Sequence, residues 1–358
     1  MSPLELGQFL STPPYDHMSD PTLPLPPLVH PHQLEVQDFA AYALIIDARS
    51  RSEYAVDHIP GAINLPASLH EPGPSTTTLS VAEPRPMSYA LAPHLEPLGL
   101  DDSVLVYCSK GGLDSEVWAS ELRGRGYEVD VLGGGWGNYR RWVDAGLMLL
   151  PRTLLLRWVQ APPVGGLALV LEALELHSEQ VLDLTTLTGQ CLAPGITLPG
   201  EPQVSQDLFE TTLLDALRYF DPDRPIWVGG SPPFGKLELP PALLAALQAS
   251  RVVRVEAPVN ARSIAWLEQL QRQQVSVASL IDTLQMLPQQ LSSLSSLATL
   301  KAAISSRQPA EVLTTILSHC IDTMFSGPAS QDAVSLRLPT LDHGEVVDAV
   351  GRWLAAGG

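Results

Sequence analysis

The sequence of 358 residues lacks the features that mark membrane, secreted and disulfide-rich proteins. It contains no run of about 18 uncharged apolar residues, so no transmembrane helix is predicted. Its first residues, MSPLELGQFLSTPPYDH, have no basic flank before an apolar block, so no signal peptide is predicted. The three cysteines, Cys108, Cys191 and Cys320, lie far apart without a CxxC pair, so neither disulfides nor a metal site is expected. These absences predict a cytoplasmic protein.

Lysine is also scarce, and the chain as a whole is acidic. Only three lysines occur, Lys110, Lys236 and Lys301, and 21 basic against 39 acidic residues give a formal net charge of −18. A protein that grips a nucleic acid backbone normally presents a basic face. The charge balance therefore disfavours tRNA as a partner, unless the chain has a local basic patch.

What the chain does contain is enough apolar residues for a large core and an alternation of strand and helix patterns. Apolar residues make up 45% of the sequence, and the length suffices for two domains and a third small unit. Residues 1–33 are rich in proline and predict a flexible tail. From residue 34, strand patterns such as YALIIDAR and SVLVYC alternate with helical patterns such as LDSEVWASELRGRG. This alternation predicts a parallel α/β domain over residues 34–150.

A second α/β unit is predicted over residues 151–275. Its strand candidates are RTLLLRWV, EQVLDL, RPIWVGG and RVVRVEAP, with helical patterns between them. Residues 276–358 are predicted to form a helical C-terminal region. Leucines recur there every three residues from Leu291 to Leu300, and DHGEVVDAVGRWL opens with the spacing of a capping box. We interpret these leucines as core residues.

The stretch VYCSKGGLDSEVWASEL, residues 106–122, carries the strongest chemical signal. Cys108 ends a predicted strand, and sites in open parallel α/β sheets form beyond the carboxyl ends of strands. Gly111 and Gly112 let the backbone curl around the sulfur, and the N-terminus of the following helix adds positive potential. Such an environment lowers a thiol pKa and stabilises a thiolate or a persulfide. An inert buried cysteine is the alternative, but the Gly-Gly turn before a helix favours a nucleophile.

Three stretches, LIIDARSRSEYAVDHIPGAINLP, VYCSKGG and GGGWGNYRRW, resemble a rhodanese domain over about residues 34–148. The resemblance implies a rhodanese-like parallel-sheet fold in which Cys108 carries sulfur or selenium as a persulfide-like adduct. It also implies an active-site loop around this cysteine, formed by Ser109, Lys110, Gly111, Gly112, Asp114 and Ser115.

Other positions in the rhodanese resemblance are interpreted as structural. Asp47 and Arg49 match the Asp-x-Arg at a strand end, and we expect them to orient loops through hydrogen bonds and a pair with Glu53. His58, Pro60 and Gly61 match a structural turn of the family, in which Asp57 replaces the usual glycine.

Further blocks are similar to tRNA 2-selenouridine synthase over residues 34–270. They are GGGWGNYRRWV, EQVLDLTTLTG, VSQDLFE, DPDRPIWV with LELPPALL, and VEAPVNAR. In that family a rhodanese domain precedes a P-loop-NTPase-like α/β domain. The enzyme exchanges the sulfur of 2-thiouridine at the wobble position of tRNA for selenium, using selenophosphate and a geranylated intermediate. The resemblance therefore implies a selenotransferase with tRNA as substrate and with selenophosphate and geranyl diphosphate as co-substrates.

The stretch that aligns with the phosphate loop of this family, APPVGGLA at residues 161–168, lacks the residues that bind phosphate. The motif G-x-x-x-x-G-K-[ST] needs glycines for backbone access, a lysine for phosphate charge and a hydroxyl for magnesium. Gly166 is kept, but the first glycine, the lysine and the hydroxyl are replaced by Ala161, Leu167 and Ala168. Two prolines also remove N–H donors. We predict a degenerate P-loop that folds but binds no cofactor and no metal.

The active-site loop departs from the family in charge. Asp114 stands where a basic residue is expected, and a carboxylate there should raise the pKa of Cys108 and repel selenophosphate. Lys110 keeps one positive charge where the family has arginine.

Three functions remain open from the sequence. The first is a selenouridine synthase relative that acts on tRNA through Cys108. The second is a sulfurtransferase or sulfur carrier that uses only the rhodanese domain, with a sulfur or selenium donor protein as partner. The third is a non-catalytic interaction protein that keeps the two-domain shell. The modification state of the wobble uridine in cells without the protein distinguishes the first from the others.

Overall fold

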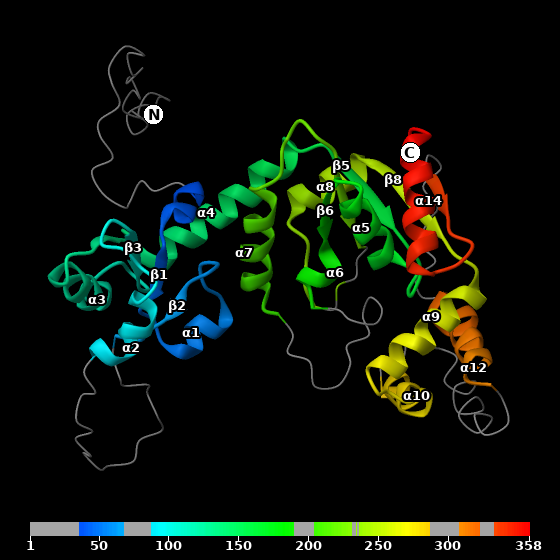
Figure 1. Cartoon of the computed structure of the whole chain (residues 1–358), viewed down its shortest axis with the longest axis horizontal. Helices are drawn as coiled ribbons and strands as arrows, with labels where there is room; N and C mark the ends of the chain where they lie inside the picture. Colours follow the sequence, from blue (N-terminus) through cyan, green and yellow to red (C-terminus); the bar gives the residue numbers. More distant parts are fainter. Residues whose placement is uncertain are drawn as a thin grey trace, which may run out of the picture.

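In the computed structural model, residues 36–67, 87–189, 204–230, 234, 236–286, 308–322 and 333–358 are described, and they form two parallel sheets covered by helices (Figure 1). The predicted tail over residues 1–33, Cys191 and the leucine repeat lie outside the described residues. The strands are β1 Leu44–Asp47, β2 Ile63–Asn64, β3 Ser103–Tyr107, β4 Glu128–Val131, β5 Leu156–Gln160, β6 Gln180–Asp183, β7 Ile226–Gly229, β8 Arg251–Glu256 and β9 Val334–Arg337. The helices are η2 Val36–Ala41, α1 Arg51–Val56, α2 Met87–Leu95, α3 Leu113–Gly124, α4 Gly135–Leu149, η3 Leu150–Arg152, α5 Leu167–Leu176, α6 Leu184–Leu187, α7 Gln206–Leu217, α8 Pro241–Ala249, α9 Val259–Arg272, α10 Val277–Met286, α12 Pro309–Ile316, η4 Leu317–Ile321 and α14 His343–Ala355.

The first sheet has the order β2-β1-β3-β4, and all its strand pairs are parallel. The side chains of neighbouring residues in β1 point to opposite faces of the sheet, as the period of two in a strand requires. Ile46 packs with Trp118 of α3, whereas Ile45 packs with Tyr139 of α4. The carboxyl ends of β1 and β3, at Asp47 and Tyr107, therefore meet at one edge of the sheet.

The second sheet has the order β6-β7-β5-β8-β9 and is also parallel throughout. The chain runs from β5 outward to β6, returns to β7 beside β5, and then crosses to β8 and β9 on the other side. One face packs against α5 and α14, and the other against α7 and α8. Together the two sheets confirm the predicted α/β class with parallel strands in both units.

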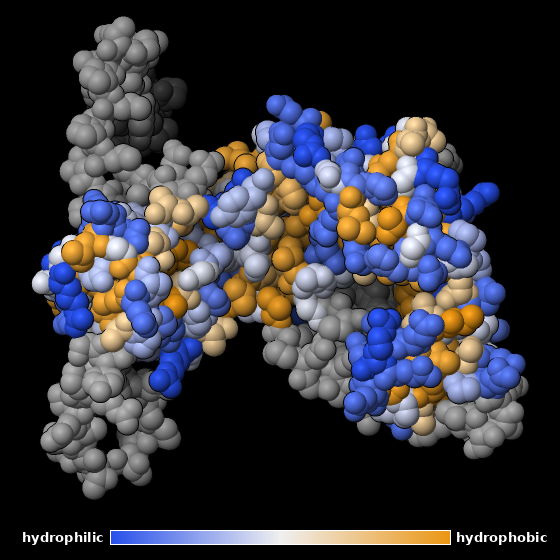
Figure 2. Space-filling model, in the orientation of Figure 1, coloured by the Kyte–Doolittle hydropathy of each residue, from blue (hydrophilic) through white to orange (hydrophobic). Residues whose placement is uncertain are grey.

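Helices α4, α7 and α8 lie between the two sheets and join them (Figure 1). One apolar cluster includes Tyr107 and Val143 of the first unit together with Phe209, Leu213 and Val228 of the second. Helices α4 and α7 approach so closely that a Cβ atom at Gly146 would lie 2.6 Å from a methyl carbon of Leu214. Figure 2 shows apolar residues over this central part of the molecule, and Met148 and Leu149 at the end of α4 are among the exposed apolar side chains.

The expectation of a helical region over residues 276–358 misses one strand. Helices α10 and α12 do form a helical cluster with α9 around Trp266, which is fully buried. However, β9 extends the second sheet beside β8, and α14 then packs on α5. A four-residue strand carries too short an alternation to stand out beside longer helical patterns.

Candidate active site around Cys108

Cys108 directly follows β3 and lies under the loop that leads into α3. Its side chain is buried, with 3% of the residue exposed. The Gly112 N–H, which belongs to the N-cap residue of α3, donates a hydrogen bond to Sγ at 3.3 Å. The sulfur is thus held at a helix N-terminus, where the backbone dipoles favour negative charge.

Two glycine turns pass each other with their backbones in contact, and this contact shapes the cradle. Gly111 has φ of +66°, and a Cβ atom there would lie 2.4 Å from the Leu132 carbonyl oxygen. Gly135 has φ of +55°, and a Cβ atom there would lie 2.2 Å from the Cys108 carbonyl oxygen. Only glycine fits either position without moving the backbone.

The thiol of Cys108 ionises more readily than an ordinary cysteine. Burial alone would raise its pKa, but hydrogen bonding from the Ser115 side chain and from backbone N–H groups of the loop outweighs burial, so the pKa lies below its usual value. Ser115 is fully buried. Within the described residues, its Oγ forms no other hydrogen bond. The Ser115 hydroxyl is therefore available to bond an atom attached to Sγ.

The other loop residues form an exposed rim. Ser109, Lys110, Gly112 and Asp114 are all exposed. The lowered pKa of Cys108 shows that the predicted opposing effect of the Asp114 carboxylate does not dominate.

Glu53 reaches the loop from α1, and sequence reasoning did not place it in the site. Its carboxylate accepts a hydrogen bond from Ser109 Oγ at 2.9 Å and from Ser50 Oγ at 2.7 Å. The bond to Ser50 is the first cause of a lowered pKa at Glu53, so this carboxylate is held ionised. The capping-box spacing of Ser50 and Glu53 is the sequence signal that could have located it.

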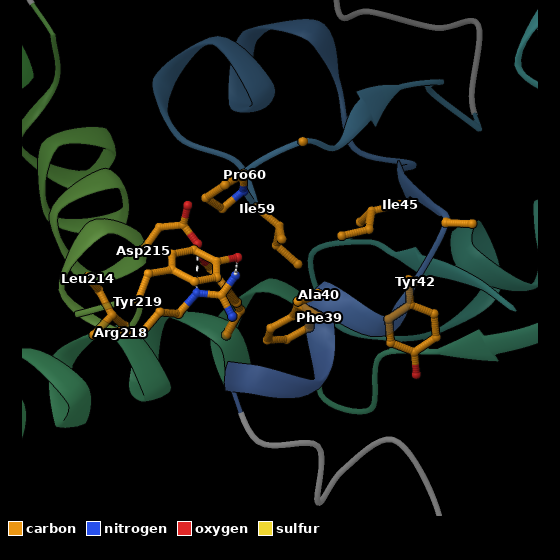
Figure 3. Close-up of a pocket in the computed structure, with 13 residues that line it drawn as sticks. Phe39, Ala40, Tyr42, Ile45, Ile59, Pro60, Leu214, Asp215, Arg218 and Tyr219 are labelled. Atoms are coloured by element: carbon orange, nitrogen blue, oxygen red, sulfur yellow. Dashed lines mark hydrogen bonds and ion pairs between the residues drawn. The ribbon is translucent and has the colours of Figure 1, made fainter. Parts of the chain in front are cut away.

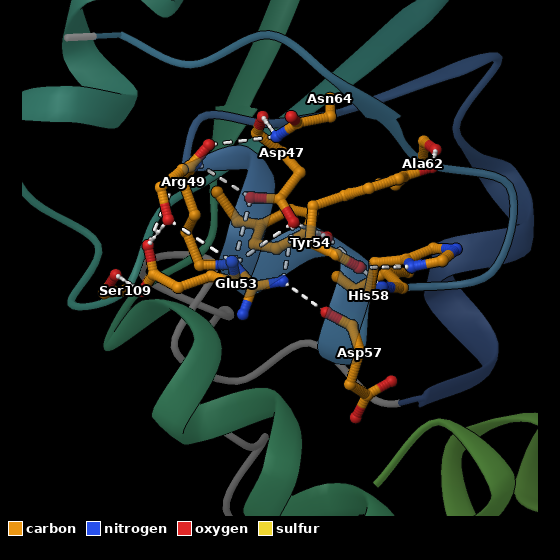
Figure 4. Close-up of polar contacts among 12 residues, drawn as sticks. Asp47, Arg49, Glu53, Tyr54, Asp57, His58, Ala62, Asn64 and Ser109 are labelled. Carbon is orange, nitrogen blue, oxygen red and sulfur yellow. Dashed lines mark hydrogen bonds and ion pairs between the residues drawn. The ribbon is translucent and has the colours of Figure 1, made fainter. Parts of the chain in front are cut away.

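A buried ion pair supports the strand ends beneath the loop (Figure 4). Arg49 Nη2 donates to Asp47 Oδ2 at 2.6 Å, and Tyr107 Oη donates to the same oxygen at 2.7 Å. The predicted pair of Arg49 with Glu53 is therefore wrong, because the guanidinium turns inward to the nearer buried carboxylate. Arg49 also lies over the ring of Trp136, 3.8 Å from its centroid, and the backbone N–H of Trp136 donates to the Cys108 carbonyl at 2.8 Å.

The turn after α1 is structural, as expected, but Asp57 has a role that the sequence did not reveal. His58 stacks on Tyr54 and Gly61 has φ of +79°. Asp57 is 2% exposed, and its Oδ2 accepts hydrogen bonds from Thr211 Oγ1 of α7 at 2.9 Å and from Arg140 at 3.1 Å. Its side chain thus leaves the rhodanese-like unit and binds a helix of the second unit.

A pocket of about 330 Å³ also opens between the two units (Figure 3). Its walls come from η2, the start of β1, the turn at residues 59–61, α4 and α7. On the α7 side, Arg218 pairs with Asp215 at 2.8 Å. None of the site residues predicted from the sequence lines this pocket.

The loop aligned with a phosphate loop lies between β5 and α5 and contacts other parts of the protein. Gly166 caps α5 with φ of +85°, and a Cβ atom there would lie 2.5 Å from a methyl carbon of Leu341. Arg262 is 3% exposed, and its Nη2 donates to the Pro163 carbonyl at 2.6 Å and pairs with Asp322 at 2.7 Å. Ala161 directly follows β5, and Leu167 and Ala168 are the first residues of α5.

No group of three or more potential metal ligands occurs among the residues that the structure describes. Within the same residues, no helix is long and apolar enough to cross a membrane.

Comparison with known proteins found similarities that fall on the first unit. Residues 32–141 match the family model described as "Rhodanese-like domain". A segment of 106 residues is 32% identical to the protein named tRNA sulfurtransferase from Desulfurococcus amylolyticus. That segment is 30% of this chain and spans only 17% of the relative's length.

Solved structures similar to part of this chain include reduced CoADR-RHD from Bacillus anthracis, with 22% identity and a TM-score of 0.23 over 33% of this chain and 17% of that one. Another is the BH2092 protein from Bacillus halodurans, with 18% identity and a TM-score of 0.21 over 31% of this chain and 71% of that one.

Proposed function

We propose that this protein transfers sulfur through Cys108 as a step in tRNA modification. The observation that carries the proposal is the cradle of Cys108, a buried thiol of lowered pKa that receives the Gly112 N–H at the N-terminus of α3. The match of residues 32–141 to the rhodanese-like domain supports the sulfur chemistry. The partial similarity to a tRNA sulfurtransferase supports tRNA as the class of acceptor.

The transfer takes place in two displacements at sulfur. The Cys108 thiolate attacks the outer sulfur of a donor persulfide, R–S–SH, so that a bond forms from Sγ to that sulfur. The electrons of the broken bond leave on R–S⁻, and Cys108 becomes a persulfide. The thiolate of a carrier protein that delivers the sulfur towards tRNA, the final acceptor, then attacks the outer sulfur, and the electrons of the S–S bond return to Sγ. The loop N–H groups and the Ser115 hydroxyl favour the anionic forms of both sulfurs.

The finer question is whether the complete exchange of sulfur for selenium at the wobble uridine is retained. The order of the sequence blocks supports that reaction, which would need selenophosphate and geranyl diphosphate. The contact of Leu341 with Gly166 and the leucine at position 167 instead favour sulfur transfer without the exchange for selenium. We therefore infer sulfur transfer by the rhodanese-like unit, with a sulfur donor protein as partner and no bound cofactor.

The proposal is tested by incubating the purified protein with a persulfide donor and measuring its intact mass. We expect one reducible sulfur adduct on the wild type and none on Cys108→Ser. A Cys191→Ser/Cys320→Ser variant should keep the adduct. An equal adduct on Cys108→Ser would refute the assignment.

The acceptor is tested by mass spectrometry of the wobble uridine in tRNA from cells without the protein. Loss of sulfur or of selenium at that base supports tRNA as acceptor, and the element lost separates sulfur transfer from selenium exchange. Unchanged tRNA in those cells would remove tRNA from the proposal while leaving the Cys108 test intact.

A further inference from the structure

Asp57 occupies a position between two networks of hydrogen bonds. Its backbone carbonyl accepts from Arg49 Nη2 at 2.7 Å, within the rhodanese-like unit. Its side chain points the other way, toward α7 of the second unit (Figure 4), where Thr211 donates to it. One residue therefore contacts both the support of the Cys108 loop and the neighbouring unit.

The contact between the two units is built from several groups around one guanidinium of the first unit. Arg140 of α4 bonds Asp57 and Thr211 at 3.1 Å each, and its Nη2 donates to Glu210 at 2.6 Å. The Ser205 hydroxyl, at the N-cap of α7, also donates to the Val56 carbonyl next to Asp57. The N-terminal half of α7 is thus fixed against the end of α1.

On the other side, short contacts lead from Asp57 to the sulfur. Arg49, held by the backbone carbonyl of Asp57, lies over the ring of Trp136, and the backbone N–H of Trp136 donates to the Cys108 carbonyl. The next residues of the same turn reinforce this path, since the Ile59 N–H donates to the Tyr107 hydroxyl at 3.2 Å. Tyr107 is the residue directly before Cys108.

We propose that Asp57 is a positioning residue through which the second unit holds the Cys108 loop in the geometry that ionises its thiol. The rhodanese pattern has glycine at this position, so the contact is additional to what the rhodanese-like unit needs to fold. The inference rests on the proposed role of Cys108 as the reacting group. Its test, however, measures only the ionisation of the thiol and does not require sulfur transfer.

The test is the rate of alkylation of Cys108 by iodoacetamide as a function of pH. It is carried out on the full chain in a Cys191→Ser/Cys320→Ser background, so that only Cys108 reacts. Asp57→Gly removes the contact from the first unit while restoring the family's residue, and Thr211→Val removes it from α7 without changing side-chain shape. Asp57→Asn keeps an acceptor for both donors. Asp144→Asn is the matched control, because Asp144 also pairs with Arg140, at 3.4 Å, but is exposed and lies on the same helix.

We expect Asp57→Gly and Thr211→Val to slow alkylation at pH 7.5 by about three- to tenfold and to displace the profile to higher pH, since the thiolate fraction falls tenfold for each unit of pKa. All variants should reach the same limiting rate at high pH, which excludes unfolding and blocked access. Asp57→Asn and Asp144→Asn should follow the wild-type profile. Both changes break the same contact, the hydrogen bond from Thr211 to Asp57. The double variant Asp57→Gly/Thr211→Val should therefore be alkylated no more slowly than the slower single variant.

Profiles of Asp57→Gly and Thr211→Val that superimpose on the wild type would overturn the inference, as would fully additive effects in the double variant. If the profiles shift as expected but the wild-type protein takes up no sulfur, the proposed function fails while the role of Asp57 stands.

Discussion

At the scale of single residues, the space around Cys108 is limited by backbone atoms. A Cβ atom at Gly135 would meet the Cys108 carbonyl oxygen at 2.2 Å and the Gly111 nitrogen at 2.4 Å. Neither atom can move away independently, since the first belongs to the loop that holds the sulfur and the second to the turn above it. The cradle therefore depends on the absence of a side chain.

We expect Gly135→Ala to lower the free energy of unfolding by ~1–3 kcal/mol, because it combines a positive φ with a clash against backbone. Urea denaturation measures the loss. The matched control is Gly137→Ala in the first turns of α4, where a Cβ atom meets nothing within 4 Å. That change should be neutral or stabilise the protein by ~0.5–1 kcal/mol. Equal stabilities of the two variants would show that the cradle tolerates a side chain.

Replacing Asp114 with arginine should lower the pKa of Cys108 further. Asp114 is exposed in the first turn of α3, and the exchange puts a positive charge near the thiolate. The rate of Cys108 alkylation below pH 7 should rise. Glu128→Arg is the control, because Glu128 pairs with Ser103 at the opposite edge of the sheet. An unchanged pKa in Asp114→Arg would mean that the side chain points away from the sulfur.

The sequence predicted some of these residues better than others, for a physical reason. Cys108 and the glycines after it stand together in one short stretch, so their relation is visible in the sequence. The bond between Ser109 and Glu53 joins residues 56 positions apart and exists only after β1 and β3 pair. The assignment of Arg49 to Glu53 instead of Asp47 has another cause: both carboxylates are local, and the sequence does not show that the Asp47 side chain is buried beside the guanidinium.

At the scale of elements, the contact between α7 and the end of α1 buries an ionisable group. Burial raises the pKa of Asp57 to about 6, although the Thr211 hydrogen bond and the Arg140 charge act in the opposite direction. The other groups that face Asp57 are Asp207, which raises its pKa, and the His58 N–H, which lowers it. Asp57 Oδ1 has no partner in the part of the chain that the structure describes.

This shift makes the stability of the protein depend on pH in a defined direction. The folded-state pKa of about 6 lies above the usual 3.8, so the folded protein binds this proton more tightly than the unfolded chain. The resulting stability is fully present below about pH 4 and is lost as the pH rises through 6. With 1.36 kcal/mol per unit, the loss is at most ~3 kcal/mol.

Unfolding free energies of wild type and Asp57→Asn, measured by urea from pH 4 to 8, check this expectation. Because the asparagine does not titrate, the difference between the two curves should change between pH 4 and 6 and then stay constant. A difference that is independent of pH would mean that the carboxyl group is not buried in solution.

Element boundaries were predictable where the pattern was long and local. Strands β1, β3, β6, β7 and β8 and helix α3 fall inside the predicted stretches because their apolar residues follow one period, and β5 extends only one residue beyond its stretch. Strand β9 was missed because only Leu336 of its four residues is buried. Its place is decided by pairing with β8, which the local sequence does not record.

At the scale of the whole molecule, segments from later in the chain cover the N-terminus of α5. Leu341, which follows β9, contacts Gly166, and Arg262 of α9 holds the Pro163 carbonyl. Apolar and internal contacts thus occupy the surroundings of the loop at residues 161–168. A lysine and a hydroxyl for phosphate and magnesium are absent from the motif itself.

We therefore expect no saturable heat when millimolar ATP, GTP or geranyl diphosphate is added with Mg²⁺ in a calorimeter. Each charge-assisted phosphate contact contributes about 1.5–3 kcal/mol, so the loss of several reduces affinity by roughly a thousandfold or more. Micromolar binding that vanishes when residues 161–168 are replaced by a Gly-Ser linker, with the fold retained, would contradict this and restore the complete exchange reaction.

The sequence predicted a division into two units, but it did not predict the apolar cluster that joins the two sheets. The boundary near residue 150 follows from the restart of the strand pattern after α4. The shared cluster that joins Tyr107 to Leu213 depends on which faces of α4 and α7 meet, and each helix pattern shows only that an apolar face exists. The role of Asp57 stayed hidden for the same reason.

Strand β9 and helix α14 complete the second unit although they lie at the end of the chain, and this order affects how the protein folds during its synthesis. Buried residues of α5, such as Leu174, pack with Val350 of α14, yet 167 positions separate the end of α5 at Leu176 from the start of α14 at His343. At about 5–20 residues per second, a ribosome needs roughly 8–35 s to cover that distance. The Cys108 unit has all its strands by residue 131 and can fold early, whereas α5 must keep an apolar face open to solvent or to a chaperone throughout that interval.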